Sequence, residues 1–234
     1  IADFANMLMS KSLDGITATT YIRMMGHTAP VNVGVYFGLT GRIYTTSVAC
    51  ASGSQGIGYA YEAIKSGQQD IMLAGGGEEL CEIVGFETNS DGAHVTQPSA
   101  PTMQRVMEMA LANAGLSPAA IGYVSAHGTA TDRGDIAETH ATLGVFGENI
   151  PISALKSYTG HTLGACGALE SWVAIEMMNH GWFNPTVNLD NIDPNCASLD
   201  YITGGGRDLD VEYVMNNNFA FGGINTSLIF KRHS

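Results

Sequence analysis

Short apolar segments alternate with helical segments along most of this chain, and this alternation constrains the fold more than any other feature. Residues 42–48 and 70–74 have the composition of strands, and residues 51–66 between them carry apolar side chains at helical spacing. A strand, a helix and a strand in this order predict a βαβ unit with a parallel sheet. The chain is therefore expected to adopt an α/β fold.

The alternation continues toward the C-terminus, whereas the first forty residues read as helical pieces interrupted by Gly15, Gly26 and Pro30. Beyond these regions the periodicity predicts helices at 98–114, 135–146 and 165–179 and strands at 123–126, 151–155, 211–216 and 226–231.

The composition narrows the class of protein. With 45% hydrophobic and only 14% charged residues, the chain reads as a globular protein with a large buried surface, which favours an oligomer. A formal net charge of −12 argues against nonspecific nucleic-acid binding, which needs a basic surface. No apolar run reaches membrane-spanning length, so we expect no membrane insertion. The first residue is Ile1 rather than methionine, which indicates a chain that begins inside a longer protein.

The cysteines show neither a C-x-x-C pair nor the spacing of a metal finger. They are Cys50, Cys81, Cys166 and Cys196. Their spacing predicts no metal site, and a reducing, cytoplasmic compartment is the simplest interpretation.

Cys50 lies where the strand expected at 42–48 meets the helix expected at 51–66. The partial positive charge of a helix N-terminus is expected to lower the pKa of this thiol and to favour a thiolate. Small neighbours such as Ala49 and Ala51 leave room for an acyl group. On position alone, a buried structural cysteine is an equally good interpretation.

Two histidines lie on glycine-supported loops beside expected strands and helices. His127 follows the strand expected at 123–126, and His161 lies between Gly160 and Thr162. Loops in such positions carry the sites of many α/β proteins. A lone histidine there is more often a packing or surface residue. A thiol together with two separate histidines instead indicates covalent acyl chemistry with charge stabilisation.

Lys156 lies in an apolar stretch with few other charges, so we expect it to have a buried carboxylate partner. The nearby candidates are Asp135, Glu138 and Glu170.

Two phenylalanines lie on a glycine turn in the segment 219–225. Phe219 and Phe221 could gate a pocket, and the backbone N–H groups of the turn could hold an oxyanion. Taken alone, the segment is better explained as a hairpin with aromatic side chains in the core.

Taken together, these segments resemble the motifs of β-ketoacyl-(acyl-carrier-protein) synthases of the elongating type. The shared pattern is the ordered succession of Cys50, HGTAT at 127–131, KSYTGHTLGACG at 156–167 and FAFGGIN at 219–225. The resemblance covers nearly the whole chain. It implies an α/β, thiolase-like fold of two related βαβ-containing halves in a layered α-β-α-β-α arrangement, here incomplete. A partial N-terminal half at 1–81 would carry the nucleophile, and a C-terminal half at 82–234 both histidines.

The resemblance implies an enzyme, an acyltransferase that elongates a fatty-acid or polyketide chain. The reaction would be a decarboxylative Claisen condensation of an acyl thioester on Cys50 with malonyl-acyl-carrier-protein. Cys50 resembles the nucleophile, and His127 and His161 the pair that stabilises the enolate. Lys156 resembles the lysine that organises His127, with Asp135 and Glu138 as its carboxylate neighbours.

The resemblance also assigns residues around this centre. The backbone N–H groups of Cys50 and Phe221 would form an oxyanion hole, the Phe221 ring would be a gate, and Glu170 would be a supporting carboxylate. The residues implied to bind substrate, including the pantetheine arm, are Thr129, Thr131, Phe219 and Gly222.

The implied partners are an acyl carrier protein and a second copy of the chain in a homodimer. No separate cofactor is implied, because the substrates are carried on the phosphopantetheine of the carrier. Carrier proteins are acidic, so a local basic patch is expected despite the net charge. Lys11, Arg23 and Lys65 are candidates for it.

The chain departs from the family pattern in two residues and in length. Ala220 takes the place of the usual glycine between the phenylalanines, and Ile224 the place of the usual threonine, so the acyl-length preference is open. The first elements of the N-terminal half are absent. A second block is absent after Cys81, which predicts that Cys81 and Glu82 are not neighbours in the protein.

Three alternatives to this function remain. A thiolase needs a second catalytic cysteine near its C-terminus, but Cys196 precedes no suitable glycine loop and Phe221 occupies the expected place. A non-catalytic partner subunit would lack the cysteine, which makes Cys50 an argument against it. A truncated, inactive condensing enzyme is the third possibility.

Overall fold

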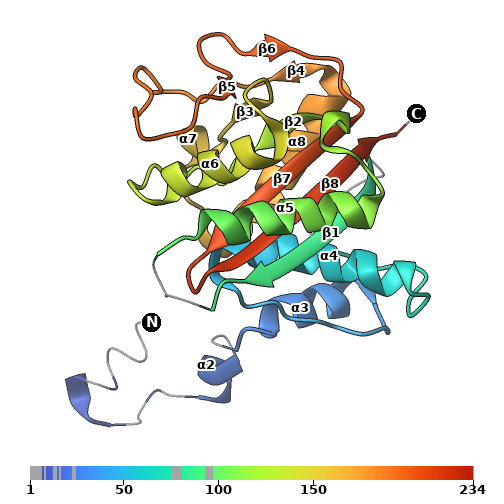
Figure 1. Cartoon of the computed structure of the whole chain (residues 1–234). Coiled ribbons are helices and arrows are strands. Elements are labelled where there is room, and N and C mark those ends of the chain that lie inside the picture. Colours follow the sequence, from blue (N-terminus) through green and yellow to red (C-terminus); the bar gives the residue numbers. More distant parts are fainter. Residues whose placement is uncertain are drawn as a thin grey trace. The chain divides into compact units, whose positions relative to one another are not determined.

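A computed structural model of the chain places its helices and strands in two compact units, Ile1–Ser47 and Val48–Ser234 (Figure 1). The structure describes residues 7, 9–12, 15, 17–22, 25–74, 81–92 and 97–233. Every side chain expected to be catalytic belongs to the second unit. The proposed division into halves at 1–81 and 82–234 is a separate question and stays a prediction.

Among the described residues of the first unit are the helices α2 (Ala18–Ile22) and α3 (Thr28–Phe37). Helix α3 ends at Gly38, whose φ of 66° allows its N–H to bond back to the last turn. Pro30 lies in the first turn of α3, where its missing N–H would have no helical partner anyway. The expectation that Pro30 interrupts a helix is therefore wrong.

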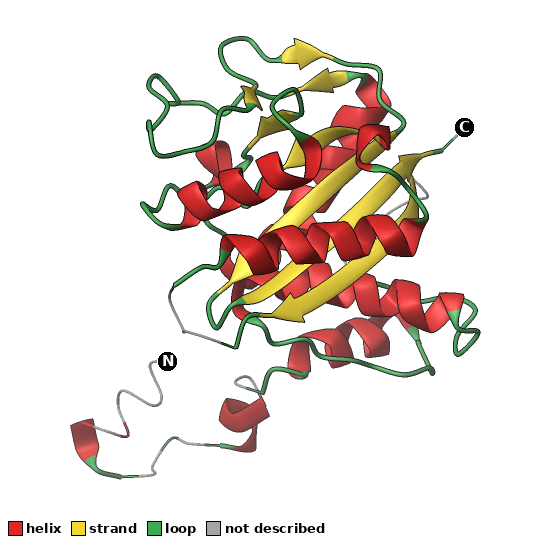
Figure 2. Cartoon of the chain, viewed as in Figure 1, coloured by secondary structure: helices red, strands yellow, loops and turns green. Residues whose placement is uncertain are grey.

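A six-stranded mixed sheet forms the centre of the second unit (Figure 2). In spatial order its strands are β1 (Cys81–Ser90), β8 (Ile224–Arg232), β7 (Tyr213–Ala220), β2 (Ile121–Ser125), β3 (Pro151–Ser153) and β5 (Asp200–Tyr201). The pairs β7–β2, β2–β3 and β3–β5 are parallel, whereas β1–β8 and β8–β7 are antiparallel. Two short strands, β4 (Trp182–Phe183) and β6 (Arg207–Asp208), pair separately.

Helices cover both faces of this sheet (Figure 1). One face carries α5 (Ala100–Ala114) with α6 (Gly134–Phe146) beside it, and the other carries α4 (Ser52–Lys65) and α8 (Cys166–His180). Strand β8 shows why both faces are apolar: Ile229 packs in the core under α5, while Leu228 and Phe230 pack in the core under α8. Short turns complete the unit at η1 (Ala49–Ala51), η2 (Pro118–Ala120), α7 (Lys156–Thr159) and η3 (Leu163–Ala165).

The helix and strand expectations after residue 97 are confirmed, but the expected βαβ unit at 42–74 is wrong. Only its helix forms, as α4, and residues 42–48 and 70–74 adopt no strand. Ile71, expected in a buried strand, is 87% exposed. A strand needs a neighbouring strand to accept and donate its backbone hydrogen bonds, and no described strand pairs with either segment. The expected glycine run at 75–77 lies outside the described residues.

The structure shows no break between Cys81 and Glu82, and the absence of a block of the family's sequence between them stays a prediction. These are successive residues of β1, opposite Arg232 and Lys231 of β8 in regular register. The chain therefore continues through this point within one strand. Among the described residues, no helix combines the length and apolar character needed to cross a membrane.

Candidate active site

Cys50 lies in the η1 turn that leads into α4, and its residue is only 5% exposed. Ala49 just before it has a φ of 41°, in the left-handed region that a residue with a Cβ rarely adopts. Gly53 lets the start of α4 approach α8, because a Cβ there would lie 2.7 Å from the backbone nitrogen of Ala168. The sharp turn and the close helix contact hold the thiol toward the ends of β2 and α7.

His161 contacts the thiol directly. Its Nε2 lies 3.0 Å from Cys50 Sγ, and its Nδ1 accepts a hydrogen bond of 3.0 Å from the backbone N–H of Leu163. Since Nδ1 is an acceptor, the hydrogen of the neutral ring is on Nε2, which donates toward the sulfur. Burial lowers the pKa of His161, and the Lys156 charge lowers it further. The ring is therefore a neutral donor at neutral pH.

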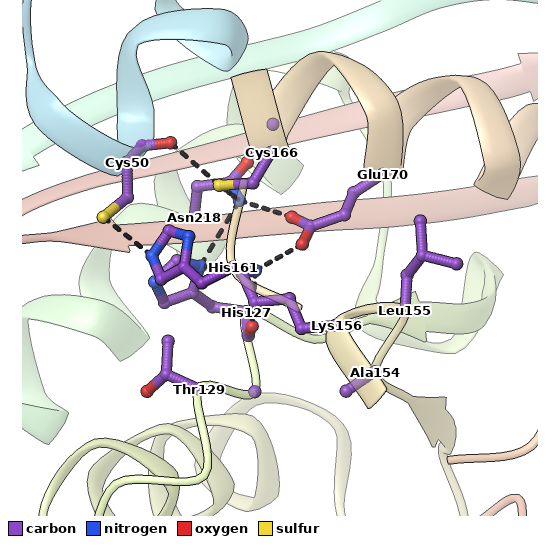
Figure 3. A network of polar contacts seen from close by, with 12 residues as sticks. Cys50, His127, Thr129, Ala154, Leu155, Lys156, His161, Cys166, Glu170 and Asn218 are labelled. Atoms are coloured by element: carbon purple, nitrogen blue, oxygen red, sulfur yellow. Dashed lines mark hydrogen bonds and ion pairs between the residues drawn. The ribbon is translucent and has the colours of Figure 1, made fainter. Parts of the chain in front are cut away.

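His127 at the end of β2 is held in the same tautomer by a different group. Its Nδ1 lies 3.0 Å from Lys156 Nζ, an ammonium that can only donate. Burial, with help from Lys156 and His161, holds the pKa of His127 well below its usual value. The two imidazole rings meet edge to face with centroids 5.5 Å apart (Figure 3). Both rings can therefore donate an N–H from Nε2 into one space.

Lys156 begins α7 and is 7% exposed. Its ammonium forms a buried ion pair with Glu170 of α8 and also donates to the carbonyl oxygen of His127 at 2.6 Å. Burial raises the pKa of Glu170, whereas the Lys156 charge favours its ionised form. Glu170 is thus the carboxylate partner among the three candidates.

Asp135 and Glu138 support the loop after β2 instead. Glu138 accepts the backbone N–H groups of His127 at 2.7 Å and Gly128 at 2.9 Å, and Asp135 accepts that of Thr129 at 3.1 Å. The expectation that they are the direct neighbours of Lys156 is corrected: they hold backbone donors. Burial raises the pKa of Glu138 to about 7 and also raises that of Asp135.

A cavity of about 500 Å³ opens onto the thiol and both imidazoles. It is also lined by Thr129 and Thr131, whose hydroxyl oxygens lie 3.0 Å apart. Both threonines therefore line the cavity, as expected for residues that the resemblance implies to bind the pantetheine arm.

The turn between β7 and β8 closes one side of the cavity. Phe219 is buried and meets His127 in an edge-to-face arrangement, whereas Phe221 is 66% exposed, and both line the cavity. Gly223 has a φ of 69°, a conformation strained for any residue with a Cβ, so this turn favours glycine. Gly222 has a φ of 83° and does not line the cavity, which makes it a turn residue. Its substrate contact, the oxyanion hole and the gate stay predictions.

The expectation that the helix N-terminus lowers the pKa of Cys50 is wrong. Burial raises the pKa of this thiol, and the charge of Lys156 offsets only part of that effect. Removing the side chain from water disfavours the thiolate more than the positive environment favours it. The Nε2–H of His161 therefore stabilises a thiolate at Cys50 once it forms.

The same three side chains have the composition of a metal site, since donor atoms of Cys50, His127 and His161 lie within 4.8 Å of one another. A metal on Nε2 would require hydrogen on each Nδ1. Leu163 N–H and Lys156 Nζ already donate to those atoms. We therefore assign hydrogen-bond donation, rather than metal ligation, to both Nε2 atoms.

The sequence arguments missed two buried residues behind this centre. Cys166 Sγ donates to the carbonyl oxygen of Cys50 at 3.2 Å, and burial raises the pKa of Cys166 to about 12, so it stays a neutral thiol. Asn218 of β7 donates to Glu170 Oε2 at 2.7 Å. The signal in the sequence was a run of three asparagines, 216–218, inside an otherwise apolar strand.

Comparison with known proteins agrees with this geometry. The 3-oxoacyl-[acyl-carrier-protein] synthase 1 of Escherichia coli (strain K12) is 32% identical over 258 residues, which cover 84% of this chain and 63% of that protein. The protein of the same name from Haemophilus influenzae is 31% identical over 253 residues, covering 82% and 62%. The chain thus spans less than two thirds of the length of these relatives. Because the 258-residue alignment is longer than the 234-residue chain, the Escherichia coli protein contains residues without a counterpart here.

Solved structures show the same fold. A β-ketoacyl synthase from Burkholderia phymatum STM815 is 49% identical with a TM-score of 0.95, covering 100% of this chain and 72% of that one. A ketosynthase from Xenorhabdus doucetiae, solved in complex with its chain length factor, is 25% identical with a TM-score of 0.83, covering 98% and 70%. These likenesses confirm the thiolase-like α/β fold and its incompleteness.

Two family profiles match the chain. Residues 4–131, more than half of the chain, match the family described as "Beta-ketoacyl synthase, N-terminal domain", and residues 80–190 match "Beta-ketoacyl synthase, C-terminal domain". With these matches and the cysteine and two histidines converging on one cavity, the chain belongs to the β-ketoacyl synthase family.

Proposed function

We propose that this chain carries the catalytic centre of an acyltransferase that elongates a fatty-acid or polyketide chain by decarboxylative Claisen condensation. One observation carries the proposal: Cys50 Sγ, His161 Nε2 and the His127 ring face one cavity, and both rings are held as Nε2–H donors. A nucleophile beside two fixed neutral donors suits the formation of a covalent acyl thioester followed by an enolate.

In the first half-reaction the Cys50 sulfur attacks the carbonyl carbon of an acyl thioester. The bond between that carbon and the pantetheine sulfur breaks, and the departing thiolate takes up the proton lost from Cys50. His161 donates to the Cys50 sulfur at 3.0 Å and so stabilises its negative charge before attack. We place the oxyanion of this step at the backbone N–H groups of Cys50 and Phe221.

In the second half-reaction the malonyl carboxylate leaves as carbon dioxide, and its electron pair forms the thioester enolate. The enolate oxygen receives the Nε2–H groups of His127 and His161, both neutral because their pKa values are lowered by burial. The enolate carbon then attacks the acyl carbon on Cys50, and the Cys50 sulfur departs with the electron pair of the broken bond. Loss of carbon dioxide supplies the carbanion, so the step needs no external base.

The proposed substrates are carried on the phosphopantetheine of an acyl carrier protein, with Thr129 and Thr131 as hydroxyl contacts for this arm. The relatives named above act on acyl-carrier-protein substrates by their names. We further propose a cytoplasmic homodimer with the carrier protein as a partner. Of the basic residues expected to dock the carrier, Lys65 donates to the Tyr61 hydroxyl at 2.6 Å, Lys11 is exposed, and Arg23 lies outside the described residues.

Intact-protein mass spectrometry after incubation with an acyl-carrier thioester tests this function. We expect one acyl adduct that maps to Cys50 and disappears in the Cys50→Ala variant, which should not condense. The Cys50→Gln variant should still release carbon dioxide from malonyl-carrier. A wild-type chain that gains no adduct would instead support the non-catalytic or truncated alternative, and adduct formation at another cysteine would refute the role of Cys50.

A further inference from the structure

Asn218 occupies the middle of the polar cluster behind the two histidines (Figure 3). Its side chain is fully buried. The amide oxygen accepts from the Ser54 hydroxyl of α4 and from Asn216 Nδ2 at 3.2 Å. With both contacts on the oxygen, the amide nitrogen must point the other way, where it donates to Glu170 Oε2 at 2.7 Å. The orientation of Asn218 is therefore fixed by its neighbours.

We propose that Asn218 is a positioning residue that fixes the tautomer of His127. It would do so by holding the Glu170 carboxylate in the orientation from which Lys156 reaches His127 Nδ1. As a consequence, the His127 ring would always donate from Nε2 to the enolate. This chemical consequence rests on the proposed function.

The number of donors and acceptors around Lys156 supports this link from Asn218 through Glu170 and Lys156 to His127. The Lys156 ammonium has three N–H groups and three acceptors, His127 Nδ1, the His127 carbonyl oxygen and Glu170 Oε1. The second oxygen of Glu170 is taken by Asn218. Every donor of Lys156 is thus used, and its position follows from that of the carboxylate with which it is paired.

Loss of the Asn218 amide would leave Glu170 Oε2 buried without that donor. A buried carboxylate oxygen without a partner is unfavourable, so the carboxylate would turn toward its remaining donor, Lys156. Movement of Lys156 toward Glu170 weakens its contact with His127 Nδ1. The ring could then carry hydrogen on either nitrogen, and the Nδ1–H form has no hydrogen to give to an enolate.

The nitrogen of Asn218 also lies 3.4 Å from His127 Nδ1, so two donors face this atom. His161 makes no hydrogen bond with Asn218 and takes its tautomer from Leu163 N–H. The proposal therefore predicts a selective defect. Steps that depend on His127 should suffer, while acylation of Cys50 beside His161 should change little.

The experiment compares Asn218→Ala and Asn218→Ser with Asn217→Ala as the matched control. Asn217 is the next residue of β7 and is equally buried, but its hydrogen bonds are to Met107 Sδ and Ser227. For both Asn218 variants we expect the rate of malonyl-carrier decarboxylation to fall about 10- to 100-fold and Cys50 acylation to change less than about 3-fold. The control should keep both rates within about 3-fold of wild type, because it leaves the cluster intact.

A third variant, Asn218→Asp, adds a pH signature. A protonated aspartic acid can donate to Glu170, whereas the carboxylate cannot, and two adjacent carboxyl groups share a proton over a raised pH range. Decarboxylation by Asn218→Asp should therefore approach the wild-type rate at low pH and fall as pH rises, over a range in which wild type is flat. A purely structural role of Asn218 would give no such recovery.

Nitrogen-15 NMR of the His127 ring gives a readout that does not depend on activity. The wild type should show one tautomer with hydrogen on Nε2, and Asn218→Ala a mixture. Unchanged NMR and decarboxylation in the Asn218 variants, or equal losses in the Asn217 and Asn218 variants, would overturn the proposal. A wild-type protein that fails to decarboxylate would refute the proposed function, while the NMR comparison would still decide the role of Asn218.

Discussion

The two loops that bring imidazoles to Cys50 hold them in opposite ways. The loop after β2 presents His127, 5% exposed, through a buried ion pair and side-chain acceptors of its backbone N–H groups. The loop after α7 presents the exposed His161 through one backbone N–H, that of Leu163. The same tautomer is thus obtained once from a network of charges and once from local backbone geometry. The network can be broken by a single side chain, whereas the backbone contact survives most substitutions.

Replacing Lys156 should have the largest effect, because it removes the charge that holds His127 but leaves the backbone contact that holds His161. In Lys156→Met the Glu170 carboxylate stays buried without its counter-ion, and we expect a loss of about 3–5 kcal/mol in the free energy of unfolding. Decarboxylation should fall at least about 100-fold, because His127 Nδ1 loses the closer of its two donors and keeps only Asn218 at 3.4 Å. Urea unfolding and carbon dioxide release measure the two effects.

The double variant Lys156→Met with Glu170→Gln separates the loss of stability from the loss of decarboxylation. It should recover most of the stability, because no buried charge remains, but none of the activity. Recovery of decarboxylation in the double variant would show that Lys156 serves stability alone.

Removal of each imidazole gives the next largest effect. His127→Ala and His161→Ala should each lower decarboxylation about 100- to 1,000-fold, since each removes one donor to the enolate. Only His161→Ala should also change the pH dependence of Cys50 alkylation, because only His161 contacts Sγ. Iodoacetamide kinetics across pH measure this. Equal alkylation profiles for the two variants would contradict the assignment of separate roles.

Glu138 should make the stability of the His127 loop depend on pH. Its pKa is about 7 in the folded protein, above its ordinary value of 4.5, so the folded state binds this proton more tightly than the unfolded chain. The resulting stabilisation is present below pH 4.5 and is lost as pH rises through 7, by about 3 kcal/mol in total. Urea unfolding between pH 4 and 8 should show a smaller loss of stability with rising pH in Glu138→Gln than in wild type, where the raised pKa values of Asp135 and Glu170 act together with that of Glu138. The exposed Glu148→Gln variant serves as the control and should keep the wild-type loss.

The smallest effect is expected at Leu163, which has a φ of 55°. Leu163→Gly removes backbone strain but adds freedom to the unfolded chain, so the free energy of unfolding should change by less than about 1 kcal/mol. The N–H to His161 remains, and decarboxylation should stay within about 3-fold of wild type. A large loss of activity in this variant would mean that the Leu163 side chain, rather than its backbone, positions His161.

Local patterns predicted the elements well where the partner elements are present. Helix α5 carries apolar side chains at helical spacing, and strand β8 is apolar on both faces. The apolar face of α5 packs in one core cluster with Ile229 of β8. Residues 70–74 have an equally apolar pattern, yet Ile71 is exposed. The difference lies in the partners: a helix closes its own hydrogen bonds, whereas a strand depends on a neighbour that its sequence cannot supply.

The sequence by itself determined the chemical inventory, namely one thiol at a strand-to-helix junction, two histidines on glycine loops and a lysine in an apolar stretch. Only the tertiary structure decided how these groups act. It paired Lys156 with Glu170 rather than with Asp135 or Glu138, raised the pKa of Cys50 instead of lowering it, and placed Asn218 between the ion pair and His127. Burial and hydrogen-bond geometry set pKa values and tautomers, and both arise from contacts between residues that are far apart along the chain.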